Sequence, residues 1–285
     1  GLAAAHAAGS AGARVILVDD QRELGGSLLS SRVEIDGRKA SHWIEKIQGE
    51  LAQIPDVKIL QRSTAFGYQD HNLVTVTQRL TEHLPLPLRQ GTRELLWKIS
   101  AKRVIPATGA HERPIVFGNN DLPGVMLASA VSSYIHRYGV MPGRRAVVFT
   151  TNDSGYQAAI DLKAAGAQVT LVDPRPQGIG TLPDTARRQG VNVLNKAVVT
   201  VAHGSTRVAS VDIAAYADGQ VGARMKTLAC DLVAMSGGFS PVLHLFAQSG
   251  GKAHWSDSRL CFIPGKAMQP ECSVGAAAGI FDLAA

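Results

Sequence analysis

The stretch GLAAAHAAGSAGARVILVDD, residues 1–20, decides the fold class. Residues 1–13 are rich in alanine and have the pattern of a helix. Residues 14–19 form a short apolar run with β-branched residues, typical of a strand buried on both faces of a parallel sheet. A helix followed by such a strand is half of a βαβ unit, so the stretch predicts an α/β protein.

The same stretch predicts a dinucleotide site. In dinucleotide-binding folds, glycines after the first strand let the backbone approach a pyrophosphate at a helix N-terminus, and an acidic residue about 20 positions later binds the ribose. Gly1 is placed to be the last of these glycines and Asp19 to be the acid, with Asp20 as the weaker candidate. We therefore expect the sequence to begin partway through the glycine motif, although a buried helix that begins at a glycine also occurs in other folds.

Two further turns fit the same site. Gly25 and Gly26 follow the acid closely and give a loop without β-carbons that can close over a dinucleotide, although a plain hairpin turn explains them equally well. The turn Ala107-Thr108-Gly109-Ala110 ends a later strand, where it would bring backbone next to the same ligand. The order and spacing of these elements after Asp19 favour one nucleotide site.

The remaining pattern predicts two Rossmann-like domains. A helix is expected over 41–53 with Ser41 as its N-cap, a strand over 57–60, and an antiparallel β-meander over about 73–105. After Pro142-Gly143 the theme repeats with a strand (146–150), a helix (154–165) and a strand (168–173). Further strands are expected over 192–194, 210–216 and 228–235.

These elements define the expected domains. The first dinucleotide-binding domain covers residues 1–140, the second covers 141–240, and 241–285 return to the first. Each is expected to have the three-layer ββα architecture of FAD/NAD(P)-binding folds.

Composition narrows the function classes. The chain has 285 residues, is 45% hydrophobic, and carries a net charge of +6 with Lys and Arg scattered along it, which argues against a nucleic-acid partner. Its apolar runs are shorter than the roughly 18 residues of a membrane-spanning helix. Cys230, Cys261 and Cys272 lie far apart, without the spacing of a metal or disulfide framework. We expect a cytoplasmic protein without a membrane or metal role.

Several stretches resemble a known family. They are Phe66-Gly-Tyr-Gln-Asp-His-Asn72, Leu96-Trp-Lys-Ile-Ser-Ala-Lys-Arg103, the segment Ala107–Gly143 with its Ala-Thr-Gly turn, and Val148-Phe-Thr-Thr-Asn-Asp-Ser154. Together with the glycine and acid spacing, they resemble the FAD/NAD(P)-binding oxidoreductases related to disulfide reductases. Within that superfamily, the whole chain is similar to the α subunits of heterotetrameric sarcosine oxidases.

The resemblance implies a multi-subunit oxidoreductase. Its members convert sarcosine, O₂ and tetrahydrofolate into glycine, H₂O₂ and methylenetetrahydrofolate. The amine is oxidised at flavin in the β subunit, whereas the α subunit carries NAD and a folate-binding region. By this resemblance the partners are the β, γ and δ subunits, and the present chain holds no catalytic residue.

Three departures refine the expectation. The segment Ser27–Arg32 lacks the cysteine pair of disulfide reductases, which excludes dithiol chemistry there. Ala276 follows Gly275 where flavin sites of the superfamily have an acid, which favours NAD over FAD. In the second domain only Gly155 and Asp173 survive from the fingerprint, so we interpret that site as vestigial or remodelled.

The predicted site and its alternatives follow from these patterns. His111 and Glu112 are the one tempting acid/base pair, and packing of a surface loop is favoured for them. The alternatives are an FAD-dependent amine or opine dehydrogenase, or a related cyanide-forming α subunit, and a scaffold subunit with two inactive nucleotide sites. The residues expected to contact the cofactor are Gly1, Asp19, Asp20, Gly25, Gly26, Ser27, Ala65, Thr108, Gly109, Ala110, Gly275 and Ala276.

Overall fold

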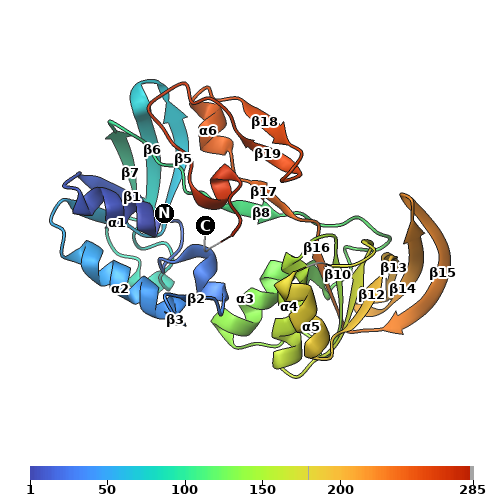
Figure 1. Ribbon diagram of the computed structural model, residues 1–285. Coiled ribbons are helices and arrows are strands. Elements are labelled where there is room, and N and C mark those ends of the chain that lie inside the picture. The colour runs from blue at the N-terminus through green and yellow to red at the C-terminus, as the bar shows by residue number, and fades with distance from the viewer. Residues whose placement is uncertain (179, 283–285) are drawn as a thin grey trace. The chain divides into compact units, whose positions relative to one another are not determined.

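The computed structural model describes residues 1–178 and 180–282 and divides them into two compact units (Figure 1). Unit 1 comprises Gly1–Leu28, Arg32–His111 and Ser240–Ala285, and unit 2 comprises Leu29–Ser31 and Glu112–Phe239. The return to unit 1 lies where the sequence placed it. The passage into unit 2, however, lies at Glu112 rather than near residue 140, because the segment that follows Glu112 supplies a strand and a helix to the second sheet.

Unit 1 has a parallel strand pair covered by two helices. Strands β1 (Val15–Val18) and β4 (Val57–Leu60) pair in parallel. Helices α1 (Leu2–Ser10) and α2 (Ala40–Ala52) contribute Ala5, Ile47 and Leu51 to a core that also contains side chains of both strands. The buried positions of α2 recur at helical spacing, so one face of the helix accounts for its packing.

The predicted cap of α2 is wrong. The helix begins at Ala40, with Lys39 in the N-cap position, so Ser41 lies inside the first turn. The short hairpin of β2 (Glu34–Ile35) and β3 (Arg38–Lys39) leads directly into the helix, and the Ala40 N–H donates to Val33 O at 3.1 Å. The hairpin and this backbone hydrogen bond thus define the start of the helix, where a hydroxyl cap was expected.

An antiparallel meander packs against the face of the parallel strand pair that the helices leave uncovered. It consists of β5 (Ser63–Gln69), β6 (Leu73–Arg79) and β7 (Glu94–Ser100), so it begins ten residues earlier than the predicted residue 73. Tyr68, Val74 and Val76 are buried in it and pack against Val18 of β1. Helices, strand pair and meander form three layers, as expected for the FAD/NAD(P)-binding fold.

Unit 2 repeats this plan with a larger sheet. Its five parallel strands lie in the order β12 (Asn192–Asn195), β11 (Gln168–Asp173), β10 (Arg145–Thr150), β16 (Leu232–Ser236) and β9 (Val125–Leu127). One face packs against α3 (Ala128–Tyr138) and α4 (Ser154–Ala164) around buried Val148, Tyr156 and Leu171. The other face packs against a three-stranded antiparallel sheet around Phe149, Val211 and Val233. The α/β prediction with a parallel sheet is therefore confirmed.

Two strand predictions in unit 2 need correction. The expected strand 228–235 is two strands, β15 (Gln220–Ala229) and β16 (Leu232–Ser236), which belong to different sheets. Cys230 and Asp231 separate them, and the Asp231 carboxylate accepts the N–H groups of Arg144 and Arg145 at 2.9 Å. The strand β13 (Ala197–Gly204), which the sequence analysis did not predict, pairs with β14 (Val208–Ala217).

The remaining elements connect these layers. The two passages between the units, β8 (Ala110–Glu112) and β17 (Phe239–Pro241), pair with each other. The others are 3₁₀ helices η1 (Gly26–Ser30), η2 (Asp70–Asn72), η3 (Leu86–Leu88) and η4 (Gly275–Ala278), strands β9 (Val125–Leu127), β10 (Arg145–Thr150), β11 (Gln168–Asp173), β12 (Asn192–Asn195), β18 (Ala253–Ser256) and β19 (Cys261–Pro264), and helices α5 (Thr181–Arg188) and α6 (His244–Gln248).

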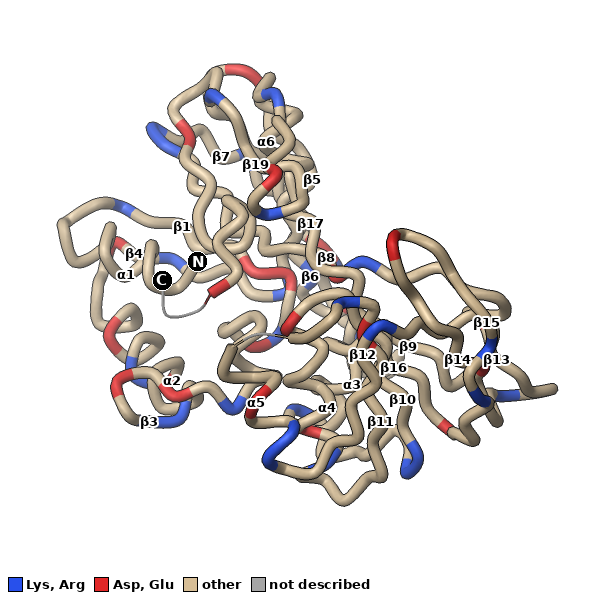
Figure 2. Tube along the Cα trace, turned by 45° about the vertical axis from the view of Figure 1, so that its right-hand side comes forward, with Lys and Arg blue, Asp and Glu red and all other residues tan. Residues whose placement is uncertain are grey.

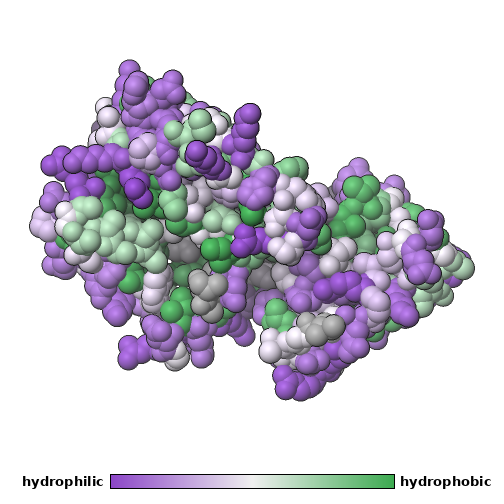
Figure 3. Space-filling view, turned by 45° about the horizontal axis from the view of Figure 1, so that its top comes forward, coloured by the Kyte–Doolittle hydropathy of each residue, from purple (hydrophilic) through white to green (hydrophobic). Residues whose placement is uncertain are grey.

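The surface shows mixed charge and scattered apolar groups. Basic and acidic residues alternate along the chain without a long run of one sign (Figure 2). The visible face in Figure 3 is largely hydrophilic, with apolar groups between the polar ones. Among the described residues, we find no helix with the length and apolar character that a membrane span requires.

Candidate nucleotide-binding site

Helix α1 begins beside the predicted Ala-Thr-Gly turn. A β-carbon added to Gly1 would lie 3.5 Å from the Ala107 Cβ, which is ordinary contact. The Asp19 carboxylate lies within electrostatic reach of the Gly1 nitrogen. The helix start, the turn and the acid are therefore neighbours within unit 1.

The backbone of Asp19 is fixed between two strands. Its N–H donates to Leu60 O at 2.9 Å, and its carbonyl accepts from the Ser63 N–H at 2.8 Å. The half-buried carboxylate accepts the Gln21 N–H at 2.9 Å through Oδ1. Because β1 ends at Val18, these bonds hold Asp19 at the carboxyl edge of the parallel pair, where dinucleotide folds place their ribose-binding acid.

Asp20 differs from its neighbour in exposure. Its side chain is exposed and accepts the Gln21 Nε2 group at 3.3 Å, while its carbonyl accepts Arg79 Nη2 at 3.4 Å. Asp19, by contrast, is half-buried.

The double glycine forms a turn into η1. Gly25 has φ 136° and Gly26 has φ 55°, backbone angles that residues with a side chain rarely adopt. A β-carbon on Gly26 would meet nothing within 4 Å. Conformation therefore explains Gly26 better than close packing does. Ser27, next in the chain, is exposed. The loop is anchored through Leu24 O, which accepts Gln48 Nε2 at 3.4 Å.

The Ala-Thr-Gly turn is held against the returning chain. The Thr108 hydroxyl donates to Val242 O at 2.7 Å, and the Val242 N–H donates to Gly109 O at 3.0 Å. Gly109 has φ 75°, so the turn uses the conformational freedom of glycine, and Ala110 then starts β8. The Thr108 side chain therefore anchors the turn to the returning chain.

The last predicted segment meets the same turn. The Val274 N–H donates to Pro106 O at 3.0 Å, which places Gly275 beside Ala107. Gly275 has φ 61° and begins η4, a 3₁₀ helix of four residues that also contains Ala276. Such a short helix carries a small dipole, so backbone N–H groups there would act mainly by direct hydrogen bonding.

The structure thus gathers part of the predicted set. Gly1, Ala107, Thr108 and Gly275 are exposed small residues at one place, with Asp19 nearby. Ala65 has a different environment, because it packs into the apolar cluster between the meander and Val18.

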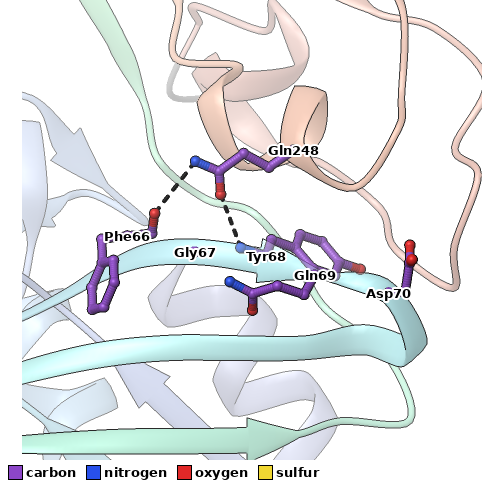
Figure 4. Close-up of a pocket in the computed structure, with 6 residues that line it drawn as sticks. All are labelled: Phe66, Gly67, Tyr68, Gln69, Asp70 and Gln248. Atoms are coloured by element: carbon purple, nitrogen blue, oxygen red, sulfur yellow. Dashed lines mark hydrogen bonds between the residues drawn. The ribbon is translucent and has the colours of Figure 1, made fainter.

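A cavity of about 440 Å³ lies elsewhere in unit 1, along β5 (Figure 4). Gln248 of α6 closes one side of it. Its Oε1 accepts the Tyr68 N–H at 2.9 Å and its Nε2 donates to Phe66 O at 3.3 Å, so a side-chain amide pairs with the edge of the strand. No predicted cofactor residue lines this cavity. The sequence analysis overlooked Gln248, and no local pattern marks it.

Glu112, Cys230 and Cys261 are buried in the fold. The tempting pair His111 and Glu112 is not an acid/base pair, because buried Glu112 accepts the Ser129 N–H at 2.8 Å at the start of α3. Cys230 and Cys261 are buried and form no disulfide among the described residues, and burial raises the pKa of Cys230 to about 11. Within residues 1–178 and 180–282, no group of His, Cys, Asp and Glu has the geometry of a metal site.

Known proteins resemble this chain over most of its length. The family model described as pyridine nucleotide-disulphide oxidoreductase matches residues 1–259. The alpha subunit of a sarcosine oxidase from Rhizobium meliloti (strain 1021) is 43% identical over 98% of this chain and 27% of its own length. The corresponding subunit from Corynebacterium sp. (strain U-96) is 43% identical over 100% of this chain and 30% of its own length. The chain therefore spans less than a third of these relatives.

More distant similarities concern the fold. An opine oxidase component from Rhizobium meliloti (strain 1021) is 29% identical over 63% of this chain and 43% of its own length. Thioredoxin reductase from T. acidophilum has a TM-score of 0.71 at 17% identity and covers 98% of this chain and 90% of its own. L-proline dehydrogenase from P. horikoshii has a TM-score of 0.68 at 20% identity over 98% of this chain and 49% of its own.

Proposed function

This chain belongs to the pyridine nucleotide-disulphide oxidoreductase family, and we propose that its unit 1 binds NAD within the α subunit of a sarcosine oxidase. The observation that carries the proposal is the joint placement of Gly1, the Ala107–Gly109 turn and Asp19 at the carboxyl edge of β1. The identity of 43% to two sarcosine oxidase α subunits supports the choice of enzyme.

Each of these groups suits one part of a dinucleotide. The backbone at Gly1 starts a nine-residue helix, where N–H groups favour a pyrophosphate. The Asp19 carboxylate suits the ribose hydroxyls, and the exposed, small residues at Ala107 and Gly275 leave the backbone accessible. When bound, NAD supplies a nicotinamide ring that can accept a hydride. In this proposal the residues of this chain hold and orient the nucleotide.

The proposal favours NAD over FAD. Ala276, with its methyl side chain, offers no carboxylate to a ribityl chain, and the segment Ser27–Arg32 offers no cysteine to accept electrons from a flavin. Both features argue for a bound nucleotide that takes no part in dithiol chemistry.

The reaction proposed for the whole protein takes place outside this chain. Sarcosine is oxidised at a flavin in the β subunit, O₂ is reduced to H₂O₂, and tetrahydrofolate takes up the one-carbon unit as methylenetetrahydrofolate, which leaves glycine; the γ and δ subunits are further partners.

The test is to release and identify nucleotides from the purified, complete assembly by mass spectrometry. We expect NAD in the native protein and a large loss of NAD in Asp19→Ala. The matched control is Asp56→Ala, because this carboxylate is 67% exposed and directly precedes β4, at the amino end of the parallel pair, so that its loss should leave the NAD content unchanged. Equal NAD content in all three proteins would refute the assigned site.

The second candidate is an FAD-dependent amine or opine dehydrogenase, favoured by the similarity to the opine oxidase component. In that case the nucleotide released from the α subunit is FAD, and this subunit shows visible flavin absorbance. A scaffold subunit would release no nucleotide at all. The same mass spectrum therefore separates the three functions.

A further inference from the structure

Unit 2 contains a second carboxyl edge with the same spacing of glycine and acid. Gly155 stands in α4 and Asp173 ends β11, at the same separation as Gly1 and Asp19. Strands β10 and β11 are adjacent and parallel. A dinucleotide in this fold would bind across the ends of these strands, so the groups that lie there decide whether unit 2 has a second site.

The acid of unit 2 is fully enclosed by its own protein. Asp173 is completely buried. Its Oδ2 accepts Arg175 Nη2 at 2.7 Å and the Tyr156 hydroxyl at 3.0 Å, while its Oδ1 accepts Arg175 Nε at 3.0 Å and the Arg175 N–H at 2.9 Å. Both oxygens thus make charge-assisted bonds within unit 2. A ribose would have to displace an arginine to reach them.

Arg175 is itself held from the other side. Its Nη2 also donates to Asp153 Oδ1 at 2.8 Å, next to the start of α4. Burial lowers the pKa of Arg175, but the hydrogen bonds and charges of Asp173 and Asp153 outweigh this and raise the pKa above its ordinary value. The guanidinium therefore stays charged and bridges the end of β11 to the loop after β10. This bridge lies across the place where the ribose would join the pyrophosphate.

The loop after β10 satisfies its own polar groups. Asn152 Nδ2 donates to Ser236 O at 3.0 Å and to Ser236 Oγ at 3.1 Å. Asn152 Oδ1 accepts the Ser154 N–H at 3.0 Å and also contacts the Ser154 hydroxyl. The first N–H of α4, which would face a phosphate in a nucleotide site, already has an acceptor.

Gly155 serves the packing of the helix. A β-carbon on Gly155 would lie 2.4 Å from the Cβ of buried Thr150, closer than real β-carbons approach. The Thr150 hydroxyl in turn donates to Asn152 O at 2.7 Å. The one surviving glycine of the fingerprint is thus explained by close contact between α4 and β10.

The open space near these strand ends is apolar. A cavity of about 360 Å³ is lined at the strand ends by Thr151 and Pro174, and its other walls include Phe117, Phe149, Val198 and Val221. These side chains offer no charge to a pyrophosphate, whose binding depends on N–H groups or cations.

We infer that unit 2 takes no dinucleotide, because Arg175 and Asn152 occupy the positions of its ribose and pyrophosphate. The pyridine nucleotide chemistry for which the family is named is thus absent from unit 2. Unit 2 then acts as a structural module, and free NADH or NADPH does not exchange electrons through it. This inference is independent of the nucleotide proposed for unit 1.

The test uses the complete assembly and a photoreactive azido analogue of NAD, with the labelled peptides mapped by mass spectrometry. A thioredoxin reductase labelled in parallel is the positive control. We expect peptides that span residues 144–178 to carry no label that excess NAD or NADP reduces. Label in those peptides that either nucleotide competes away would overturn the inference.

The same experiment separates this inference from the function proposed for unit 1. Competable label confined to peptides of unit 1 supports both. With a labelled positive control, absence of label from both units supports the inference about unit 2. The mass spectrum of the released nucleotides then decides separately whether unit 1 already holds NAD, and a spectrum without NAD contradicts only the proposal for unit 1.

Discussion

The two units of this chain share one plan but differ in how they treat one carboxylate. In both, a helix precedes a parallel strand with an aspartate at its carboxyl end, the last residue of β11 in unit 2 and the residue after β1 in unit 1, and a three-stranded antiparallel sheet follows. Asp19 in unit 1 is half-buried and contacts the backbone of its own turn, whereas Asp173 in unit 2 is fully buried and bound to Arg175 and Tyr156. The position of an acid in a fingerprint therefore does not settle its use. In unit 2, complete burial and the bonds from Arg175 and Tyr156 commit the acid to the fold.

The difference also extends to the glycines. A β-carbon on Gly1 would make an ordinary contact with Ala107, whereas a β-carbon on Gly155 would clash with Thr150. In unit 1 the small residues lie at an exposed edge, and in unit 2 they permit tight packing. The carboxyl edge of the parallel strands is thus accessible in unit 1. In unit 2 the groups at the corresponding edge stabilise the fold by contacts with one another.

The largest effect is expected from Arg175→Ala. It leaves the buried Asp173 carboxylate without its counter-ion, which costs about 3–5 kcal/mol of the free energy of unfolding. Denaturant unfolding of the complete protein measures this loss. The control is Arg187→Ala, whose partner Asp184 is 65% exposed, so that its loss costs about 0–1 kcal/mol. Equal destabilisation by both variants would mean that Asp173 is not a buried, paired charge.

Exchanging the acids for amides compares the two units directly. Asp19→Asn removes a charged acceptor from the proposed ribose position and should weaken nucleotide binding by about 1.5–3 kcal/mol, or roughly 10–150-fold. Asp173→Asn should leave nucleotide binding unchanged. Nucleotide titration of the two purified proteins measures both values. A weaker affinity in Asp173→Asn would transfer the binding site to unit 2.

The glycines allow a smaller test. Gly155→Ala forces a β-carbon against Thr150, and such overpacking lowers the free energy of unfolding by about 1–3 kcal/mol. Gly1→Ala adds a methyl group in ordinary contact with Ala107 and should leave stability nearly unchanged. Thermal or denaturant unfolding compares the variants. If Gly155→Ala is neutral, helix α4 does not depend on close contact with β10.

The smallest effect concerns two buried tyrosines, one in each unit. Burial raises the pKa of Tyr68 and of Tyr156 from 10.0 to about 12, with the charges of Glu271 and Asp173, respectively, acting in the same direction. Between these values the unfolded chain has lost protons that the folded chain retains, so stability falls as pH rises from about 10 to about 12.

Tyrosinate absorbance during a pH titration checks this. Tyr68→Phe and Tyr156→Phe should each remove one late-titrating phenol. Asp173→Asn should lower the pKa of Tyr156 and leave Tyr68 unaffected, because only Tyr156 donates to Asp173. An unchanged titration in Asp173→Asn would show that burial alone controls Tyr156.

Local pattern was sufficient for the strands of the parallel sheets. The runs at 57–60 and 168–173 match β4 and β11, because apolar residues flanked by turn residues leave few alternatives. Pattern failed where one apolar run serves two sheets. At Cys230 and Asp231 the chain passes from β15 to β16, and the Asp231 carboxylate binds the N–H groups of Arg144 and Arg145 at this break.

The candidate site divides in the same way. Gly1, Asp19 and the Ala107–Gly109 turn could be grouped from spacing, since the order of elements in an α/β fold brings strand ends to one edge. Ala65 and Glu112 could not be assigned from spacing, because packing against Val18 and a bond to the start of α3 define their surroundings. Arg175 lies only two residues after Asp173 in the sequence. Its ion pair with Asp173 could not be predicted, because the sequence of a loop does not specify which acid a charged side chain will contact.

The sequence by itself determined that this chain builds two units on one α/β plan and where the acid of each unit lies, because apolar periodicity and glycine spacing are local properties. Only the tertiary structure decided that Asp19 stays at an accessible edge while Asp173 is enclosed. Burial and ion pairing depend on groups from separate elements, here Tyr156, Asp153 and Arg175, whose distances exist only after the helices and strands have packed.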